Sequence, residues 1–102
     1  MEKIQELFTC MIDEFEINRR MKELRNHLKV TVDDFSLKTG IKSGQISSIE
    51  NNRQKVYGWH IQVISDIWPK YAYWLATGKT IEDCGQISPE LEETRRNLKT
   101  GT

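Results

Sequence analysis

Long apolar runs and glycine-rich phosphate loops are missing from the 102-residue sequence. A helix that spans a bilayer needs about 20 consecutive apolar residues, and no run approaches that length, so no membrane contact is expected. The first residues, MEKIQELF, lack the basic start and the cleavage site of a secretory signal, which favours a cytoplasmic protein. No Ser/His/Asp or Cys/His arrangement stands out either, and we expect no enzyme activity.

Cysteine and histidine are too few and too scattered for a metal site. Cys10 and Cys84 form no CxxC motif, and His27 and His60 add no zinc-ligand spacing. We therefore expect two reduced thiols, no metal and no cofactor.

A net charge of either sign is also lacking, since 15 Lys and Arg balance 15 Asp and Glu. The charges are nevertheless segregated along the chain. Residues 1–16 hold one Lys and five acids (−4), residues 17–60 hold nine Lys and Arg and four acids (+5), and residues 61–102 hold five and six (−1). A basic middle segment suits binding to phosphate, although a charge cluster is also typical of an ordinary solvated face.

Apolar residues recur at helical spacing and no strand pattern is present, which predicts an all-α fold. The first expected helix covers residues 3–15, with an apolar stripe of Ile4, Leu7, Phe8, Met11, Ile12 and Phe15. Asn18 is expected to cap a second helix, unless the two helices run on as one. Further helices are expected over about 31–39, 43–50, 59–67, 69–76 and 89–98, with Pro69 and Pro89 at first-turn positions.

The most informative unit runs from Thr31 to Asn51. Thr31 begins a helix of about eight residues, Gly40 supplies the left-handed residue of a sharp turn, and a second short helix follows, which is the spacing of a helix-turn-helix. Asn52 tolerates positive φ and can end that second helix. Its inward residues are Ile46 and Ile49, and its outward residues are Ser43, Gly44, Gln45 and Ser48.

The outward residues carry groups suited to the edges of DNA bases. Gln45 can pair bidentately with adenine N6 and N7, and Ser43 and Ser48 can contact bases or phosphates. Gly44 reads no base but allows the backbone to approach DNA closely. A helical hairpin whose polar face is merely solvated is the alternative at this point.

Residues from about Asn18 to Lys79 resemble the phage-repressor class of helix-turn-helix domains, also called the xenobiotic-response-element class. The matching stretches are RRMKELRNHLKVTVDDF, TGIKSGQISSIENN and DIWPKYAYWLATGK. The resemblance implies a lambda-repressor-like five-helix domain over 17–79. The helical patterns outside it add an N-terminal amphipathic helix in 1–16 and a C-terminal linker and helix in 80–102. The resemblance also implies a structural ion pair between Arg25 and Glu50, and the family's closing Trp-Leu-x-x-Gly element is matched by Trp74, Leu75 and Gly78.

The resemblance assigns base reading to Ser43, Gly44, Gln45 and Ser48. It assigns phosphate contacts to Thr31, Lys42, Asn51, Asn52, Arg53 and Lys55. This sequence departs from the family at Val32, where Gln often contacts phosphate, at Asn52, where Gly is usual, and at Gly44. These departures predict fewer side-chain contacts to base edges. Specificity would then depend partly on DNA shape, and affinity on Lys and Arg contacts to phosphates.

The implied function is a regulator that binds double-stranded DNA, a phage or mobile-element repressor acting as a homodimer on a palindromic operator. An antitoxin of a toxin–antitoxin pair and a protein-interaction module that has lost DNA binding are the alternatives. The N- or C-terminal helices would contact the second subunit or another protein, and residues beyond Ile67 are favoured for the dimer. The three Trp and three Tyr residues are expected in the core and in subunit contacts.

Overall fold

The computed structural model describes residues 13–100, with the side chains of 13–98, so nearly all of the helix expected over 3–15 lies outside it. The elements follow in the order α2 (Glu16–Leu28), α3 (Val32–Thr39), α4 (Ser43–Glu50), α5 (Gly58–Ile67), η1 (Pro69–Tyr71), α6 (Ala72–Thr77), η2 (Glu82–Cys84) and α7 (Pro89–Thr100). Within this part of the chain, the β structure is limited to one isolated bridge between Ile81 and Gln86. The all-α prediction is confirmed.

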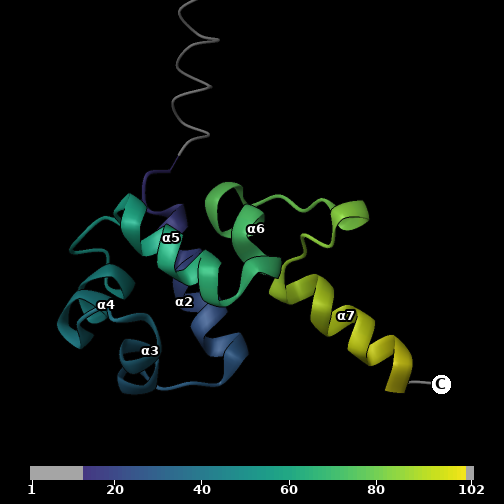
Figure 1. Ribbon diagram of the computed structural model, residues 1–102, viewed down its shortest axis with the longest axis horizontal. Coiled ribbons are helices and arrows are strands. Elements are labelled where there is room, and N and C mark those ends of the chain that lie inside the picture. Colours follow the sequence, from purple (N-terminus) through teal and green to yellow (C-terminus); the bar gives the residue numbers. More distant parts are fainter. Residues whose placement is uncertain (1–12, 101–102) are drawn as a thin grey trace, which may run out of the picture.

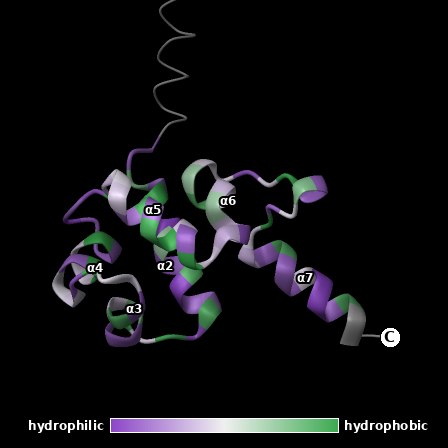
Figure 2. Cartoon of the chain, in the orientation of Figure 1, coloured by the Kyte–Doolittle hydropathy of each residue, from purple (hydrophilic) through white to green (hydrophobic). Residues whose placement is uncertain are grey.

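The helices are spread along the long axis of the molecule (Figure 1). The pair α3 and α4 lies at one end, α2, α5 and α6 form the middle, and α7 projects at the other end. Hydrophobic residues concentrate where α2, α4 and α5 meet, whereas α7 is mostly hydrophilic (Figure 2). The end that carries α3 and α4 is therefore separated from the end that carries α7.

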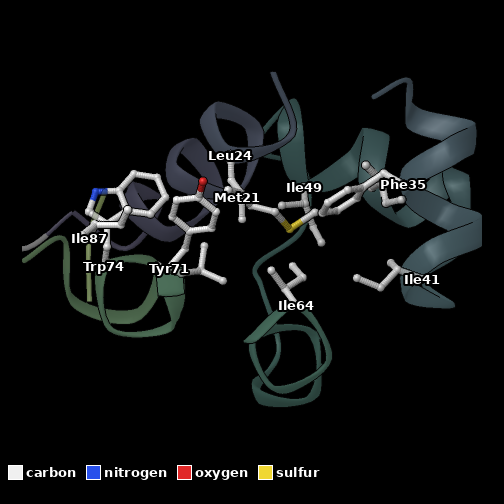
Figure 3. Packing of buried hydrophobic residues seen from close by; sticks show 11 residues of the cluster. Met21, Leu24, Phe35, Ile41, Ile49, Ile64, Tyr71, Trp74 and Ile87 are labelled. Carbon is white, nitrogen blue, oxygen red and sulfur yellow. The ribbon is translucent and has the colours of Figure 1, made fainter. Parts of the chain in front are cut away.

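One hydrophobic core joins α2 to α6 and the segment before α7 (Figure 3). Met21 and Leu24 of α2 lie between the aromatic rings of Tyr71 and Trp74 on one side and Ile49 and Phe35 on the other. The buried members are Met21, Leu24, Phe35, Ile41, Ile46, Ile49, Ile64, Tyr71, Trp74, Leu75 and Ile87. Because α4 on one side and α6 on the other both pack on α2, this helix fixes the position of the α3–α4 pair.

The turn between α3 and α4 forms as the sequence predicts. The Thr31 hydroxyl accepts a hydrogen bond from the Asp34 N–H at 3.1 Å and caps α3. Gly40 ends α3 with a φ of 79°. The next residue, Ile41, is buried, and its carbonyl accepts a 2.6 Å hydrogen bond from the Ser36 hydroxyl. These local contacts set the angle at which α4 leaves α3.

The prediction that Asn18 caps a helix is wrong. Phe15 occupies the N-cap position of α2, and Asn18 lies inside the helix with 1% of its surface exposed. Its amide Nδ2 donates to the carbonyls of Ile49 at 3.0 Å and Gln54 at 2.7 Å. The Ile49 carbonyl lies at the end of α4 and the Gln54 carbonyl lies beyond it, so neither has a partner within a helix and the buried amide supplies a donor to both. Asn18 thus ties α2 to the end of α4.

The single helix expected over 69–76 is instead two elements. A 3-10 turn, η1, begins at Pro69, and α6 follows and ends at Gly78, whose φ is 78°. Proline begins η1 because its missing N–H would have no helical partner there. The last helix begins as predicted, since the Ser88 hydroxyl accepts from the Leu91 N–H at 3.0 Å.

Glu92 anchors the start of α7 to the body of the protein. Its carboxylate accepts hydrogen bonds from the Tyr71 hydroxyl at 2.5 Å and from His27 Nε2 at 2.7 Å, and it also pairs with Lys70. Burial opposes ionisation of Glu92, but the hydrogen bonds outweigh it and lower its pKa to about 2. Beyond this cluster, residues 93–98 of α7 are exposed.

We expect Glu92→Gln to lower the melting temperature at pH 7 by several degrees. The pKa falls from 4.5 to about 2 on folding. With a discount for partial exposure, this shift contributes on the order of 2 kcal/mol. Because folding lowers the pKa, the contribution is complete above pH 4.5 and is lost as the pH falls toward 2. Thermal melts across this interval should show the two proteins converging.

Glu90→Gln is the matched control, because Glu90 is exposed on the same helix. It should leave the melting temperature nearly unchanged. A wild-type advantage over Glu92→Gln that stays constant between pH 5 and pH 2 would contradict the role given to the Glu92 carboxylate.

Candidate nucleic-acid interface

The second helix of the helix-turn-helix, α4, buries one face and leaves the other accessible. Ile46 and Ile49 are fully buried, as predicted. On the opposite face Gly44 and Ser47 are exposed, and the remaining predicted base-reading residues, Ser43, Gln45 and Ser48, are partly buried. Sequence reasoning passed over Ser47, although its position one turn after Ser43 and Gly44 places it on their face.

Arg25 and Glu50 meet in a two-pronged ion pair. Arg25 Nε and Nη2 donate to the two Glu50 carboxylate oxygens at 2.6 and 2.9 Å, and Nη1 donates to the Val30 carbonyl at 2.8 Å. The side chains are 15% and 8% exposed. The hydrogen bonds that Arg25 donates to Glu50 raise the pKa of Arg25, so the guanidinium stays charged. The pair connects the end of α4 to α2.

The chain leaves α4 through a Schellman turn centred on Asn52. Asn52 has a φ of 58°, and its N–H donates to the Ile49 carbonyl at 3.1 Å. The following N–H, of Arg53, donates to the Ser48 carbonyl at 2.8 Å. Asn52 therefore adopts the conformation that glycine usually supplies, and the turn fixes where the exposed Arg53 emerges.

All residues predicted to contact phosphate are exposed: Thr31, Lys42, Asn51, Asn52, Arg53 and Lys55. Three of them have partners in the protein. Thr31 caps α3, Asn51 Nδ2 donates to the Ser47 carbonyl at 2.9 Å, and Lys55 Nζ lies 3.0 Å from a Glu14 carboxylate oxygen. Lys42 and Arg53 make no side-chain hydrogen bond or ion pair with the described residues, and they lie just before and just after α4.

Two acids share this end of the molecule. Asp33 and Asp34 are exposed in the first turn of α3. The Ser43 hydroxyl donates to Asp33 Oδ1 at 3.2 Å, which joins the start of α3 to the start of α4. Sequence reasoning did not single out Asp33, because the two residues are ten positions apart and neither belongs to an apolar pattern.

The aromatic residues are expected in the core and in subunit contacts, and the core holds only some of them. Tyr71 and Trp74 are buried, and Trp68 stacks on Phe35 with ring centres 5.5 Å apart. Tyr57 and Trp59 are instead 54% and 46% exposed. Their rings contact the ring of His60 near the start of α5, and it is the His60 imidazole that is buried there. Burial lowers the pKa of His60.

Other kinds of site find no support in the described part of the chain. Residues 13–98 contain no group of three or more His, Cys, Asp or Glu side chains that could hold a metal ion. No helix described is long and apolar enough to cross a membrane. Cys84 is a free, exposed thiol, and Cys10 lies outside the described residues.

The arrangement of α2 to α6 defines a helix-turn-helix protein. Residues 18–73 match the helix-turn-helix domain family, which is more than half of the chain, so the protein belongs to that family. Among solved structures it is similar to Pf6r from the filamentous phage Pf6 of Pseudomonas aeruginosa PA01, with 26% sequence identity and a TM-score of 0.68. The alignment covers 81% of this chain and 96% of Pf6r. No curated protein matches the sequence significantly.

We expect Glu50→Ala to lower the melting temperature clearly. The change leaves the Arg25 guanidinium largely buried without its carboxylate, which costs about 3 kcal/mol. Glu50→Gln should cost less, because the amide oxygen still accepts one hydrogen bond. The matched control is Glu23→Ala, at an exposed position of α2. An unchanged melting curve for Glu50→Ala would show that the ion pair does not hold α4.

Proposed function

We propose that the protein is a sequence-specific regulator that binds double-stranded DNA and places α4 in the major groove. The observation that carries the proposal is the fixed and uncovered position of α4. Ile46 and Ile49 bury its inner face and Glu50 holds its end, whereas Gly44 and Ser47 stay exposed. Membership of the helix-turn-helix family and the similarity to a phage protein support a DNA-binding regulator.

The charged groups around α4 suit the two phosphate backbones that border a major groove. Lys42 precedes the helix and Arg53 follows it, so one cation is available at each end. Lys55 must leave Glu14 to reach a phosphate. That exchange costs little, because both side chains are about 60% exposed and exposed ion pairs contribute about 0–1 kcal/mol. In this proposal Thr31, Asn51 and Asn52 add uncharged contacts.

We further propose that the protein is a repressor of the phage or mobile-element type that acts as a homodimer. The eight-residue α4 spans only a few base pairs, so one copy gives little operator specificity. A two-fold dimer would present two such helices to half-sites roughly 10 base pairs apart and would occlude the promoter. The outer part of α7, with Leu98 68% exposed, is the proposed contact, and it also suits another protein, as in the antitoxin alternative.

Selection of bound duplexes from random DNA with the purified protein, at stated salt, tests the function. The proposal expects an enriched palindrome. Recovery of unenriched DNA would contradict sequence-specific binding, and no binding at low salt would favour a protein-interaction module.

We expect Arg53→Ala to weaken binding by a similar factor on all sequences. Arg53 is exposed just after α4, and a lost phosphate contact lowers the slope of log affinity against log salt by about one. Fluorescence anisotropy titrations at several salt concentrations measure this slope. Lys79→Ala, an exposed cation in the loop after α6, should leave the slope unchanged. Altered base preference with an unchanged slope would refute the phosphate assignment.

We expect Gln45→Ala to cost about 1–3 kcal/mol on the selected site and to relax preference at one base pair of each half-site, because it removes a bidentate amide. Ser48→Ala should cost less. Gln62→Ala, an exposed amide on α5, serves as the control in the same binding titrations. Equal losses on selected and random DNA would contradict direct reading of a base by Gln45.

We expect sedimentation at micromolar concentration to give about twice the chain mass of 12.0 kDa. Leu98→Glu should shift the protein toward the monomer, because it replaces the exposed apolar side chain of the proposed α7 contact with a charge. Glu90→Gln is a control on the same helix. A wild-type monomer that also binds DNA as a single copy would overturn both the dimer and the palindrome.

A further inference from the structure

Asp33 and Ser43 form a side-chain contact on the face of α4 that is proposed to meet DNA. Ser43 is the first residue of α4, and its hydroxyl donates to Asp33 Oδ1 at 3.2 Å. Asp33 is exposed and makes no ion pair with the described residues. A carboxylate without a cationic partner is repelled by DNA phosphates. Its position beside Ser43, a proposed base-reading residue, therefore suggests that it affects recognition.

The contact changes what Ser43 can recognise. A free serine hydroxyl both donates and accepts, and it can therefore bond to the edge of any base pair. A carboxylate oxygen accepts hydrogen bonds, so Asp33 Oδ1 accepts the one hydrogen bond that the Ser43 hydroxyl can donate. The Ser43 oxygen then has only lone pairs to offer. In the major groove the donors that can reach such an oxygen are the amino groups of adenine N6 and cytosine N4.

We propose that Asp33 is a specificity-determining positioning residue that holds Ser43 as a hydrogen-bond acceptor. Ser43 then selects adenine or cytosine on the strand it faces and disfavours thymine and guanine, whose O4 and O6 atoms are acceptors. Asp33 acts through Ser43 and does not itself need to touch a base. The inference rests on the proposed DNA-binding function and adds the chemical class of base that α4 reads at its start.

Asp34 provides a control that distinguishes the proposed role of Asp33 from the effect of its negative charge alone. It is the next residue, it is equally in the first turn of α3, and it is also exposed. The structure assigns its side chain no bond to Ser43, whose hydroxyl is engaged by Asp33. Removing either carboxylate lowers the repulsion of phosphates. Only removal of Asp33 leaves the Ser43 hydroxyl free to donate a hydrogen bond to a base.

The test compares DNA selections by the wild type, Ser43→Ala, Asp33→Ala and Asp34→Ala. Ser43→Ala should flatten one position of each half-site, which identifies the base pair that Ser43 faces. The wild type should hold adenine or cytosine there on one strand. Asp33→Ala should admit thymine or guanine at that same position, with a loss of preference of roughly two- to tenfold, the range for one hydrogen bond. Asp34→Ala should leave the position unchanged.

Three further measurements sharpen the comparison. Both aspartate variants should bind random DNA more tightly by similar factors, because each removes one negative charge. In the Ser43→Ala background, Asp33→Ala should change the base preference no further, since Asp33 acts through Ser43. Matching thermal melts of the two aspartate variants exclude a folding defect.

The outcomes separate this inference from the function on which it rests. A wild-type preference for thymine or guanine at the Ser43 position would overturn the inference and leave DNA recognition intact. So would an Asp33→Ala selection identical to the wild type, a Ser43→Ala selection with no flattened position, or equal relaxation by Asp34→Ala. If the wild type selects no sequence, the proposed function fails and the inference fails with it.

Discussion

The ion pair between Arg25 and Glu50 is the contact on which the orientation of α4 depends. It joins the end of α4 to α2 with hydrogen bonds of 2.6 and 2.9 Å, and Asn18 reinforces the same junction through the Ile49 carbonyl. Hydrophobic burial of Ile46 and Ile49 gives affinity between the helices but little direction, because dispersion and burial are not directional. The polar contacts supply the direction and so determine which residues of α4 face outward.

Charge in this protein is organised locally, which is why a net charge of zero is compatible with the proposed DNA contact. Cations lie at both ends of α4, whereas the Asp33 carboxylate at the start of α3 accepts a hydrogen bond from Ser43, the first residue of α4. At the far end of the long axis, Glu92 gathers Lys70, Tyr71 and His27 and fixes α7. The surface proposed to contact DNA and the surface proposed to contact a second protein thus lie at opposite ends of the molecule (Figure 1).

Local signals made much of the fold predictable from sequence. Thr31, Gly40 and Asn52 each act within a turn of their own position, so the ends of α3 and α4 could be placed in advance. The role of Asn18 is not predictable from the sequence, because a helix cap and a buried amide that bonds to distant carbonyls use the same side chain. The Asp33–Ser43 contact and the contacts of Glu92 join separate helices, so no local sequence pattern predicts them.

The most direct test of the account is amide chemical-shift mapping of isotope-labelled protein titrated with its selected duplex at moderate salt. If α4 binds the major groove, the largest changes should fall on residues 42–48 and on Arg53, with the core of α2 little affected and α7 (Pro89–Thr100) unchanged by the DNA. Largest changes along α7, or small changes spread evenly over the chain, would contradict the claim that α4 is the surface that recognises DNA.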